Sequence, residues 1–261
     1  MEGPYISPMD GPRGAHKSGE VRKPDWDEFC RLQEAARGLI RLVTLSPEYE
    51  ETPGFIEKAV RAGVKIAIGH TSARSDQIKA AVEAGATLCT HLGNGSHTML
   101  PRHPNYIWDQ LAEDCLWATV IADGHHLPEN VLRVFNKVKR DKMILVSDSV
   151  ALAGLPPGNY QAEVGGAVTL TQAGLLHLQG KEHTLAGSAQ NILEGIRHIV
   201  NIGICSLAEA IDKASILPAM VMGLDNYKGL EIDAPADFLL LNCSGSEITV
   251  EKTFKNGIEV L

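Results

Sequence analysis

The sequence lacks the features that mark nucleic-acid-binding, membrane and secreted proteins. It has no run of Lys and Arg, and 24 basic against 32 acidic residues give a formal net charge of −8, which argues against a nucleic-acid backbone as partner. No uninterrupted apolar stretch approaches the roughly 18 residues of a membrane span. The start, Met1 to Pro4, has neither the basic nor the apolar region of a signal peptide. We therefore expect no membrane association.

Cysteine is also scarce. The five cysteines are odd in number, scattered, and never arranged as a Cys-x-x-Cys pair, so they indicate neither a disulfide framework nor a structural zinc site. We expect them to act as small hydrophobic residues in a reduced, cytoplasmic protein. They are Cys30, Cys89, Cys115, Cys205 and Cys243.

Three common catalytic signatures are missing as well. No Gly-x-Ser-x-Gly elbow, Walker-type loop or glycine-rich dinucleotide fingerprint follows a predicted strand. The sequence therefore gives no support for a serine hydrolase, a nucleotide hydrolase or a dehydrogenase.

Short apolar runs alternate with helical segments along the first 150 residues. The runs read as strands covered on both faces, and strands that alternate with helices form a parallel α/β sheet. A single α/β barrel of roughly 250 residues would account for a chain of this length, but five strands cannot close an eight-stranded ring. The expected strands are 39–45, 64–69, 87–90, 117–122 and 143–147; the expected helices are 26–37, 50–62, 75–84, 128–138, 188–202 and 207–214.

The remaining segments are rich in β-structure. Residues 156–185 alternate and turn on glycines, and the tail from 237 again reads as strands. We therefore divide the chain into a barrel (1–155 and 186–225) and a small β-rich accessory domain (156–185 and 226–261).

Polar residues stand at the ends of the expected strands. His70 and His91 each follow a strand, Asp148 follows the last one, and the strand 117–122 runs into Asp123 and then His125 and His126. The carboxyl ends of parallel strands form the site-bearing edge, and neutral imidazoles are good ligands for zinc or iron. The pattern predicts a metal-dependent enzyme, although a lone histidine of this kind is more often a hydrogen-bonded core residue.

Two further features allow more than one interpretation. Asp148 could cap a following helix, but residues 149–157 are rich in Ala, Gly and Pro and make a poor helix. The loop Asn94-Gly95-Ser96 could present backbone N–H groups to an anion, or could be an ordinary turn.

Taken together, these segments resemble the N-acetylglucosamine-6-phosphate deacetylases of the amidohydrolase superfamily over essentially the whole chain. The motifs that carry the resemblance are Glu2-Gly3-Pro4, Gly14-Ala15-His16-Lys17, Thr44-Leu45-Ser46-Pro47-Glu48, Gly69-His70-Thr71-Ser72-Ala73, Thr90-His91-Leu92-Gly93-Asn94, Ala122-Asp123-Gly124-His125-His126, Val146-Ser147-Asp148-Ser149 and Leu185-Ala186-Gly187-Ser188.

The resemblance implies a TIM-type (β/α)8 barrel with a small β-sandwich, and a metal-dependent deacetylase. By position, Glu2, His70 and His91 hold a divalent metal ion, with zinc favoured over iron, manganese or cobalt. Asp148 is the general base and then the general acid, and His126 polarises or orients the acetyl carbonyl. His16, Asn94 and Gly95 contact the sugar or its phosphate.

The chain departs from the family pattern at two places. The family has three more barrel strands ahead of its Glu-Gly-Pro motif, so we expect this chain to be the C-terminal portion of a longer protein. The family's phosphate-binding Gly-Arg-Glu-Pro stretch is replaced by Pro101-Arg102-His103-Pro104. Arg102 is the best candidate for contacting phosphate, across the interface of a homodimer that the resemblance implies.

We therefore expect hydrolysis of the acetamide of an N-acetyl amino-sugar phosphate. Two alternatives stay open: an amidohydrolase that acts on another N-acyl amino sugar or an N-acyl amino acid, and a truncated scaffold that has lost turnover.

Overall fold

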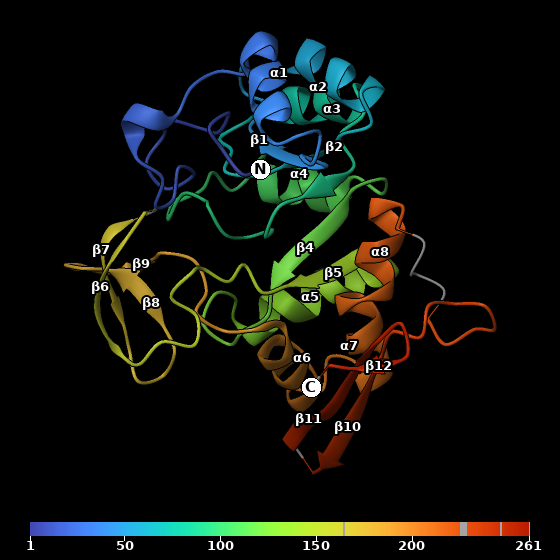
Figure 1. Ribbon diagram of the computed structural model, residues 1–261. Helices are drawn as coiled ribbons and strands as arrows, with labels where there is room; N and C mark the ends of the chain where they lie inside the picture. The colour runs from blue at the N-terminus through green and yellow to red at the C-terminus, as the bar shows by residue number, and fades with distance from the viewer. Residues whose placement is uncertain (164, 225–228, 246, 261) are drawn as a thin grey trace.

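A parallel five-stranded sheet forms the centre of the molecule in the computed structural model, which describes residues 1–163, 165–224, 229–245 and 247–260 (Figure 1). The strands lie in chain order, each parallel to the next. They are β1 (Leu42–Leu45), β2 (Lys65–Ile68), β3 (Leu88–Cys89), β4 (Trp117–Ile121) and β5 (Met143–Val146). The five predicted strands are therefore confirmed, as part of a TIM-type barrel.

The first residues of the chain extend this sheet beyond β1. Glu2 forms a parallel bridge with Thr44, and the Met1 amino group donates a 2.7 Å hydrogen bond to the carbonyl of Leu42. These contacts place the Glu2 side chain in line with the carboxyl ends of the neighbouring strands.

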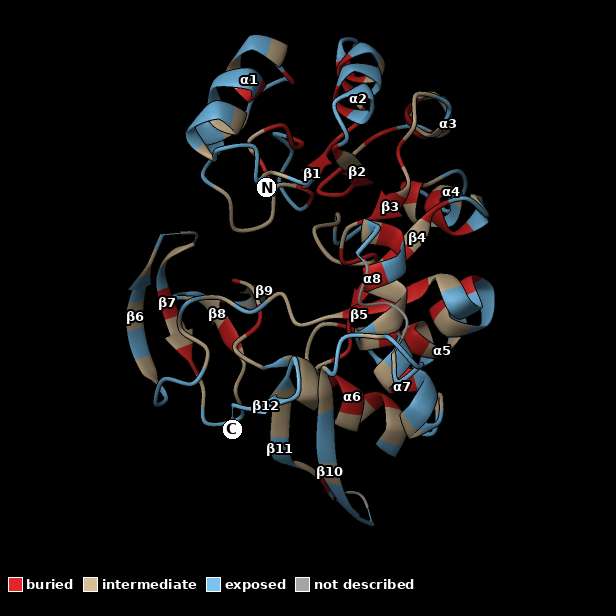
Figure 2. Cartoon of the chain, turned by 45° about the vertical axis from the view of Figure 1, so that its right-hand side comes forward, coloured by how far each residue is buried: buried red, intermediate tan, exposed pale blue. Residues whose placement is uncertain are grey.

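Helices cover the outer face of the sheet, as Figure 2 shows by the buried colouring of the strands between them. Alternate strand residues such as Val43, Ile66 and Leu145 pack against them in the main core, because both faces of a parallel sheet must be covered. The helices are α1 (Trp26–Ala35), α2 (Thr52–Arg61), α3 (Ser75–Glu83), α4 (Tyr106–Ala112), α5 (Glu129–Lys139), α6 (Ile192–Asn201) and α7 (Leu207–Ala214), with short 3-10 turns η1 (Ser18–Glu20) and η2 (Arg140–Lys142).

One further helix, α8 (Ile216–Met222), joins a second core on the other side of the sheet. Its Val221 packs with Ala67, Leu88 and Ile144, whose side chains alternate along their strands with those that face the outer helices. No helix among the described residues is long and apolar enough to cross a bilayer.

The β-rich segments form two separate antiparallel sheets in the part of the chain that the structure describes. One contains β6 (Gly158–Ala162), β7 (Gly166–Leu170), β8 (Leu176–Leu178) and β9 (Lys181–Leu185); the other contains β10 (Phe238–Ser244), β11 (Glu247–Lys255) and β12 (Ile258–Glu259). They lie on different sides of the molecule in both views (Figures 1 and 2), with α6 to α8 between them in sequence. The division into one barrel and one accessory domain stays a prediction, and residues 164, 225–228, 246 and 261 of it lie outside the described residues.

Candidate active site and metal centre

The predicted site residues at the strand ends share an unusual backbone conformation. His70, His91 and Asp148 each come two residues after the end of β2, β3 or β5, and their φ angles are +50°, +30° and +51°. Residues other than glycine rarely adopt positive φ, and each such residue costs on the order of 1–3 kcal/mol when the structure enforces it. Strain of this kind concentrates at functional sites. The repetition at three strand ends therefore marks this edge as the functional one.

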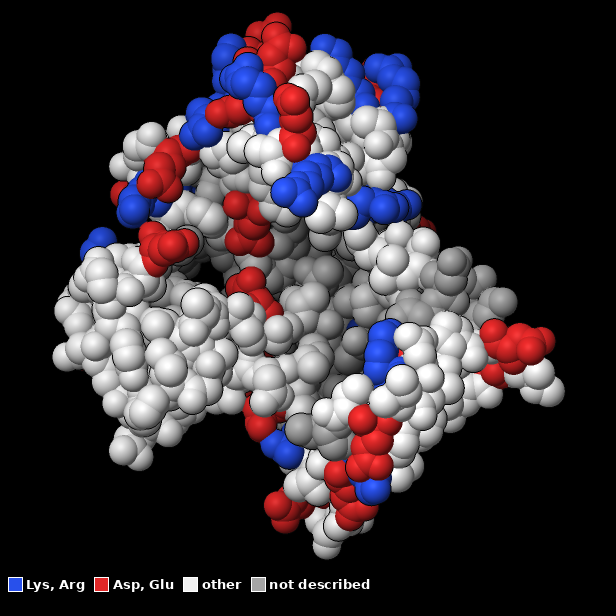
Figure 3. Space-filling model, viewed as in Figure 1, with Lys and Arg blue, Asp and Glu red and all other residues white. Residues whose placement is uncertain are grey.

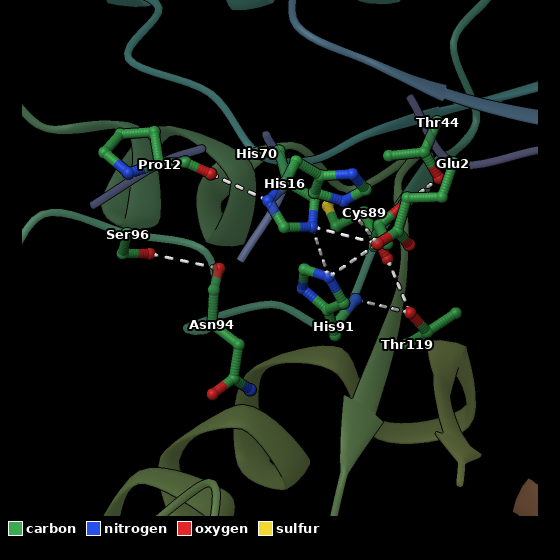
Figure 4. Close-up of polar contacts among 11 residues, drawn as sticks. Glu2, Pro12, His16, Thr44, His70, Cys89, His91, Asn94, Ser96 and Thr119 are labelled. Atoms are coloured by element: carbon green, nitrogen blue, oxygen red, sulfur yellow. Dashed lines mark hydrogen bonds and ion pairs between the residues drawn. The ribbon is translucent and has the colours of Figure 1, made fainter. Parts of the chain in front are cut away.

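Three metal-binding side chains converge at this edge (Figure 4). The Glu2 carboxylate Oε1 lies 3.0 Å from His70 Nε2 and 3.6 Å from His91 Nε2, and the two imidazole nitrogens lie 3.0 Å apart. One possible ligand atom from each residue falls within 4.8 Å of the others. A carboxylate and two imidazoles form a donor set that suits zinc and other divalent transition metals.

The surroundings of His70 fix which of its nitrogens is free to bind a metal. Its Nδ1–H donates a 2.7 Å hydrogen bond to the carbonyl of Pro12, so the lone pair sits on Nε2, the atom that faces Glu2. Gly95 lies so close to the ring that a Cβ there would come within 2.8 Å of His70 Nδ1. An outer hydrogen bond that orients a ligating imidazole is typical of metal sites.

The protonation states of two of these residues also fit a metal. Burial by itself would raise the pKa of the Glu2 carboxyl, but hydrogen bonds with His16, His70 and His91 hold that pKa well below its ordinary value. Burial lowers the pKa of His70. An ionised carboxylate beside a neutral imidazole is the state in which both can bind a cation.

Asp148 lines the same cavity as Glu2, His70 and His91. Burial raises the pKa of its carboxyl above the ordinary value, as expected for a charged group that loses its water. No helix follows it between 149 and 157, so the alternative of a helix cap is wrong. A carboxyl with a raised pKa is suited to accept and return a proton near neutral pH.

His126 is held by Asp123, the residue two positions after the end of β4. His126 Nδ1 lies 2.8 Å from Asp123 Oδ2, and both side chains are almost fully buried. Burial would raise the pKa of Asp123, but the hydrogen bond from His126 and those from two backbone N–H groups hold it well below its ordinary value.

An open cavity of about 810 Å³ is lined by Glu2, His70, His91, His126 and Asp148. Its far wall is formed by β9 and the residues after it. Figure 3 shows this face hollowed at its middle, with acidic side chains along the hollow. No Lys or Arg is among the described residues that line the cavity, whereas Glu2, Asp148 and Glu182 are. The volume suits a small-molecule ligand, but the lining supplies no permanent positive charge.

The structure brings together most of the other predicted site residues. His16 Nε2 lies 3.6 Å from the Glu2 carboxylate, and Asn94 and Gly95 line the cavity. The amide of Asn94 points away from the imidazoles in Figure 4, and its Nδ2 is buried with no hydrogen-bond partner among the described residues. Arg102 lies in an exposed loop and does not line this cavity, so its role stays a prediction.

The sequence did not predict the supporting roles of Asp123, Pro12 and Ser188 at this edge. Asp123 was visible as a strand-end carboxylate, and its spacing of three from His126 was the available signal for their pairing. Pro12 supports His70 through its backbone carbonyl, which any residue type offers, so no sequence signal could have identified it. Ser188, which donates to Asp123 Oδ2 at 3.1 Å, comes from a distant segment.

Comparison with known proteins identifies the family of the chain. Residues 16–260 match the model of the amidohydrolase family. This chain belongs to that family.

Characterised relatives share about a third of its residues. An N-acetylgalactosamine-6-phosphate deacetylase of Escherichia coli O157:H7 is 30% identical over 88% of this chain and 59% of its own length. An N-acetylglucosamine-6-phosphate deacetylase of Danio rerio is 31% identical over 100% of this chain and 64% of its own length. Over that aligned part, the chain is similar to enzymes that differ in the sugar they are named for.

A solved structure shows the same fold. The D267A mutant of N-acetyl-D-glucosamine-6-phosphate deacetylase from Mycobacterium smegmatis, in complex with N-acetyl-D-glucosamine-6-phosphate, matches with a TM-score of 0.88 and 28% identity, covering 100% of this chain and 67% of that one. The chain thus spans about three fifths to two thirds of the length of the proteins it resembles.

Proposed function

We propose that this protein is a metal-dependent deacetylase, which hydrolyses the acetamide of an N-acetyl amino-sugar phosphate to acetate and the free amine. The observation that carries the proposal is the convergence of Glu2, His70 and His91 in one cavity with Asp148. Similarity to deacetylases of amino-sugar phosphates supports the choice of substrate.

Glu2, His70 and His91 would hold a divalent metal ion, with zinc the first choice for two imidazoles and a carboxylate. Such an ion supplies Lewis acidity, which lowers the pKa of water and stabilises negative charge on an oxygen. His70 presents Nε2 because Pro12 binds its other nitrogen, so this ligand needs no rearrangement.

Asp148 would move the protons, and His126 would orient the acetamide. Asp148 takes the proton from the attacking water and returns it to the nitrogen of the leaving amine, a shuttle that its raised pKa favours. His126, with Nδ1 bound to Asp123, has only Nε2 available to contact the acetamide. A neutral His126 can accept a hydrogen bond there from the acetamide N–H, and only a protonated ring can donate to the acetyl carbonyl. His16 and Asn94 are placed to contact the sugar.

A phosphorylated substrate needs positive charge, and no Lys or Arg is found among the described residues of the cavity lining. We propose that the protein acts as a homodimer and that Arg102, exposed on its loop beside the exposed Met99, reaches the phosphate in the partner's cavity. Its proposed location is the cytoplasm, where exposed thiols such as Cys30 and Cys115 stay reduced.

The same observation favours a second candidate, hydrolysis of an N-acyl amino sugar that carries no phosphate. The part of the cavity lining that the structure describes offers histidines and carboxylates, which can bind sugar hydroxyls, but no Lys or Arg to neutralise a phosphate.

Acetate release by the zinc-loaded chain tests both candidates. N-acetylglucosamine 6-phosphate, N-acetylgalactosamine 6-phosphate and unphosphorylated N-acetylglucosamine would be compared at equal concentration, with bound metal measured in the same sample. Preference for a phosphate ester supports the first candidate, and preference for the neutral sugar supports the second. Stoichiometric zinc without acetate release from any of the three would contradict both and favour a scaffold without turnover.

A further inference from the structure

The carboxylate of Asp123 accepts four hydrogen bonds, more than a simple surface group would. Its Oδ1 accepts from the backbone N–H groups of His125 and His126 at 2.9 and 3.0 Å. Its Oδ2 accepts from His126 Nδ1–H at 2.8 Å and from the hydroxyl of Ser188 at 3.1 Å. The carboxylate is therefore fixed from several directions, and it has no freedom to turn away from the His126 ring.

This arrangement decides where the proton of a neutral His126 resides. An ionised carboxylate can only accept hydrogen bonds, so the ring must keep its proton on Nδ1. The lone pair then lies on Nε2, and His126 lines the cavity. Every exchange of a proton or hydrogen bond with a substrate must consequently take place at Nε2.

Ser188 connects the pair of Asp123 and His126 to the segment that carries Asp148. Ser188 is 1% exposed. Its backbone N–H donates to the carbonyl of Asp148 at 3.1 Å, and its own carbonyl accepts from the N–H of Val150 at 2.9 Å. One buried residue is thus bonded both to the carboxylate behind His126 and to the backbone on either side of the Asp148–Val150 turn.

We propose that Asp123 is a positioning residue that holds His126 in the tautomer with the proton on Nδ1, and that Ser188 locks this pair to the strand end that carries Asp148. Neither residue touches the substrate in this arrangement. The inference rests on the role of His126 in the proposed function, but the tautomer itself can be observed without turnover.

The variant Asp123→Asn reverses the hydrogen-bond pattern with little change in shape. The two backbone N–H groups still need an acceptor, so the amide oxygen must face them and the NH2 group must face His126. An NH2 group donates, so Nδ1 becomes an acceptor and the proton of the neutral ring moves to Nε2. Ser188→Ala removes one hydrogen bond and leaves the carboxylate in place.

Nitrogen-15 NMR of the histidine rings measures this directly, on the zinc-loaded chain at a pH where the rings are neutral, with the His126 signals identified by their loss in His126→Gln. We expect pyrrole-type Nδ1 and pyridine-type Nε2 in the wild type and in Ser188→Ala, and the reverse in Asp123→Asn. We also expect kcat to fall roughly 10- to 100-fold in Asp123→Asn with KM little changed, and less in Ser188→Ala. Asp141→Asn, the same substitution at an exposed residue, should change neither.

A proton on Nε2 in the wild type would overturn the proposal, and so would an unchanged tautomer in a folded Asp123→Asn variant. A switched tautomer with unchanged kcat would also overturn it, because the position of the proton would then have no consequence. If Asp123→Asn does not fold, the wild-type tautomer and the kcat of Ser188→Ala still decide the question. Absence of turnover in the wild type contradicts the proposed function instead, and leaves the assignment of the tautomer to stand or fall on the spectrum.

Discussion

The two ends of the parallel sheet bury charged groups in opposite ways. At the amino end, Lys139 at the end of α5 is 5% exposed, and its ammonium donates to the carbonyls of Gln110, Glu113 and Leu116 at 2.8 to 3.1 Å. The ammonium of Lys213 likewise donates one hydrogen bond, 2.6 Å long, to the carbonyl of Arg140. Backbone dipoles there compensate each buried charge.

At the carboxyl end, charged and titratable groups face one another across a cavity. Glu2, His70 and His91 point their binding atoms at a common centre, Asp148 keeps a raised pKa, and three residues of this edge have positive φ. The raised pKa of Asp148 and the three positive φ angles are unfavourable for folding. Buried charges at the amino end therefore serve stability, whereas the carboxyl end retains unfavourable features that serve chemistry.

The largest effect is expected from His91→Ala at the carboxyl end. This substitution removes one of three ligands, so bound zinc should fall to near zero, and acetate release should fall with it. Metal analysis after gel filtration measures the first and an enzymatic acetate assay the second. His103→Ala, at an exposed loop position, should keep its metal. Full zinc stoichiometry in His91→Ala would show that His91 is not a ligand.

Asp148→Asn should separate turnover from metal binding. The amide cannot shuttle a proton, so kcat should fall by about 10³-fold, whereas zinc content stays near that of the wild type because Asp148 is outside the ligand cluster. Asp141→Asn provides the same chemical change on the surface. Appreciable turnover in Asp148→Asn would remove this residue from the mechanism.

Lys139→Met tests the other side of the comparison. The methionine fills similar space but removes the ammonium donor from three carbonyls, of which that of Glu113 keeps the backbone N–H of Leu116. The free energy of unfolding should therefore fall by about 2–3 kcal/mol, while kcat of the folded fraction stays unchanged. Lys142→Met is the matched control, since Lys142 donates one bond to a carbonyl on the surface. Urea unfolding measures the difference. Loss of kcat in a fully folded Lys139→Met variant would contradict the proposal that buried charges at the amino end serve stability and not chemistry.

Much of the sheet was predictable from the sequence, because strands buried on both faces read as continuous apolar runs. The segment Lys65–Ile68 and the others formed where expected, and the polar residue after each run was visible by position alone. Two helices were not predicted. The helix α4 has only seven residues, and α8 carries Pro218 near its start and packs on the inner side of the sheet, so neither shows a long amphipathic pattern.

The site was predictable to a lesser extent. The positions of His70, His91 and Asp148 followed from the strand ends, whereas Glu2 came only from the family resemblance, since it follows no apolar run. The pairing of Ser188 with Asp123 joins residues 65 positions apart, and such contacts depend on tertiary structure that local patterns do not encode.

The smallest effect concerns acid stability, and it follows from Asp123. Its pKa is lower in the folded protein than in the unfolded chain, where an Asp titrates at about 3.9. The unfolded state therefore binds more protons as the pH falls through that value, so the stabilisation is present above it and is lost toward the lower folded pKa. Between pH 5 and pH 3 the wild type should lose about 1 kcal/mol more than Asp123→Asn, with the unfolding free energy measured in urea at both pH values. Asp141→Asn should follow the wild type.

Equal losses in Asp123→Asn and the wild type would mean that this strand-end carboxylate stabilises the fold no more than a surface group, which would place it with the costly side chains of the carboxyl end. The expected difference would instead make Asp123 the exception there, a residue that contributes to stability because its hydrogen bonds are all satisfied, as those of Lys139 are at the opposite end.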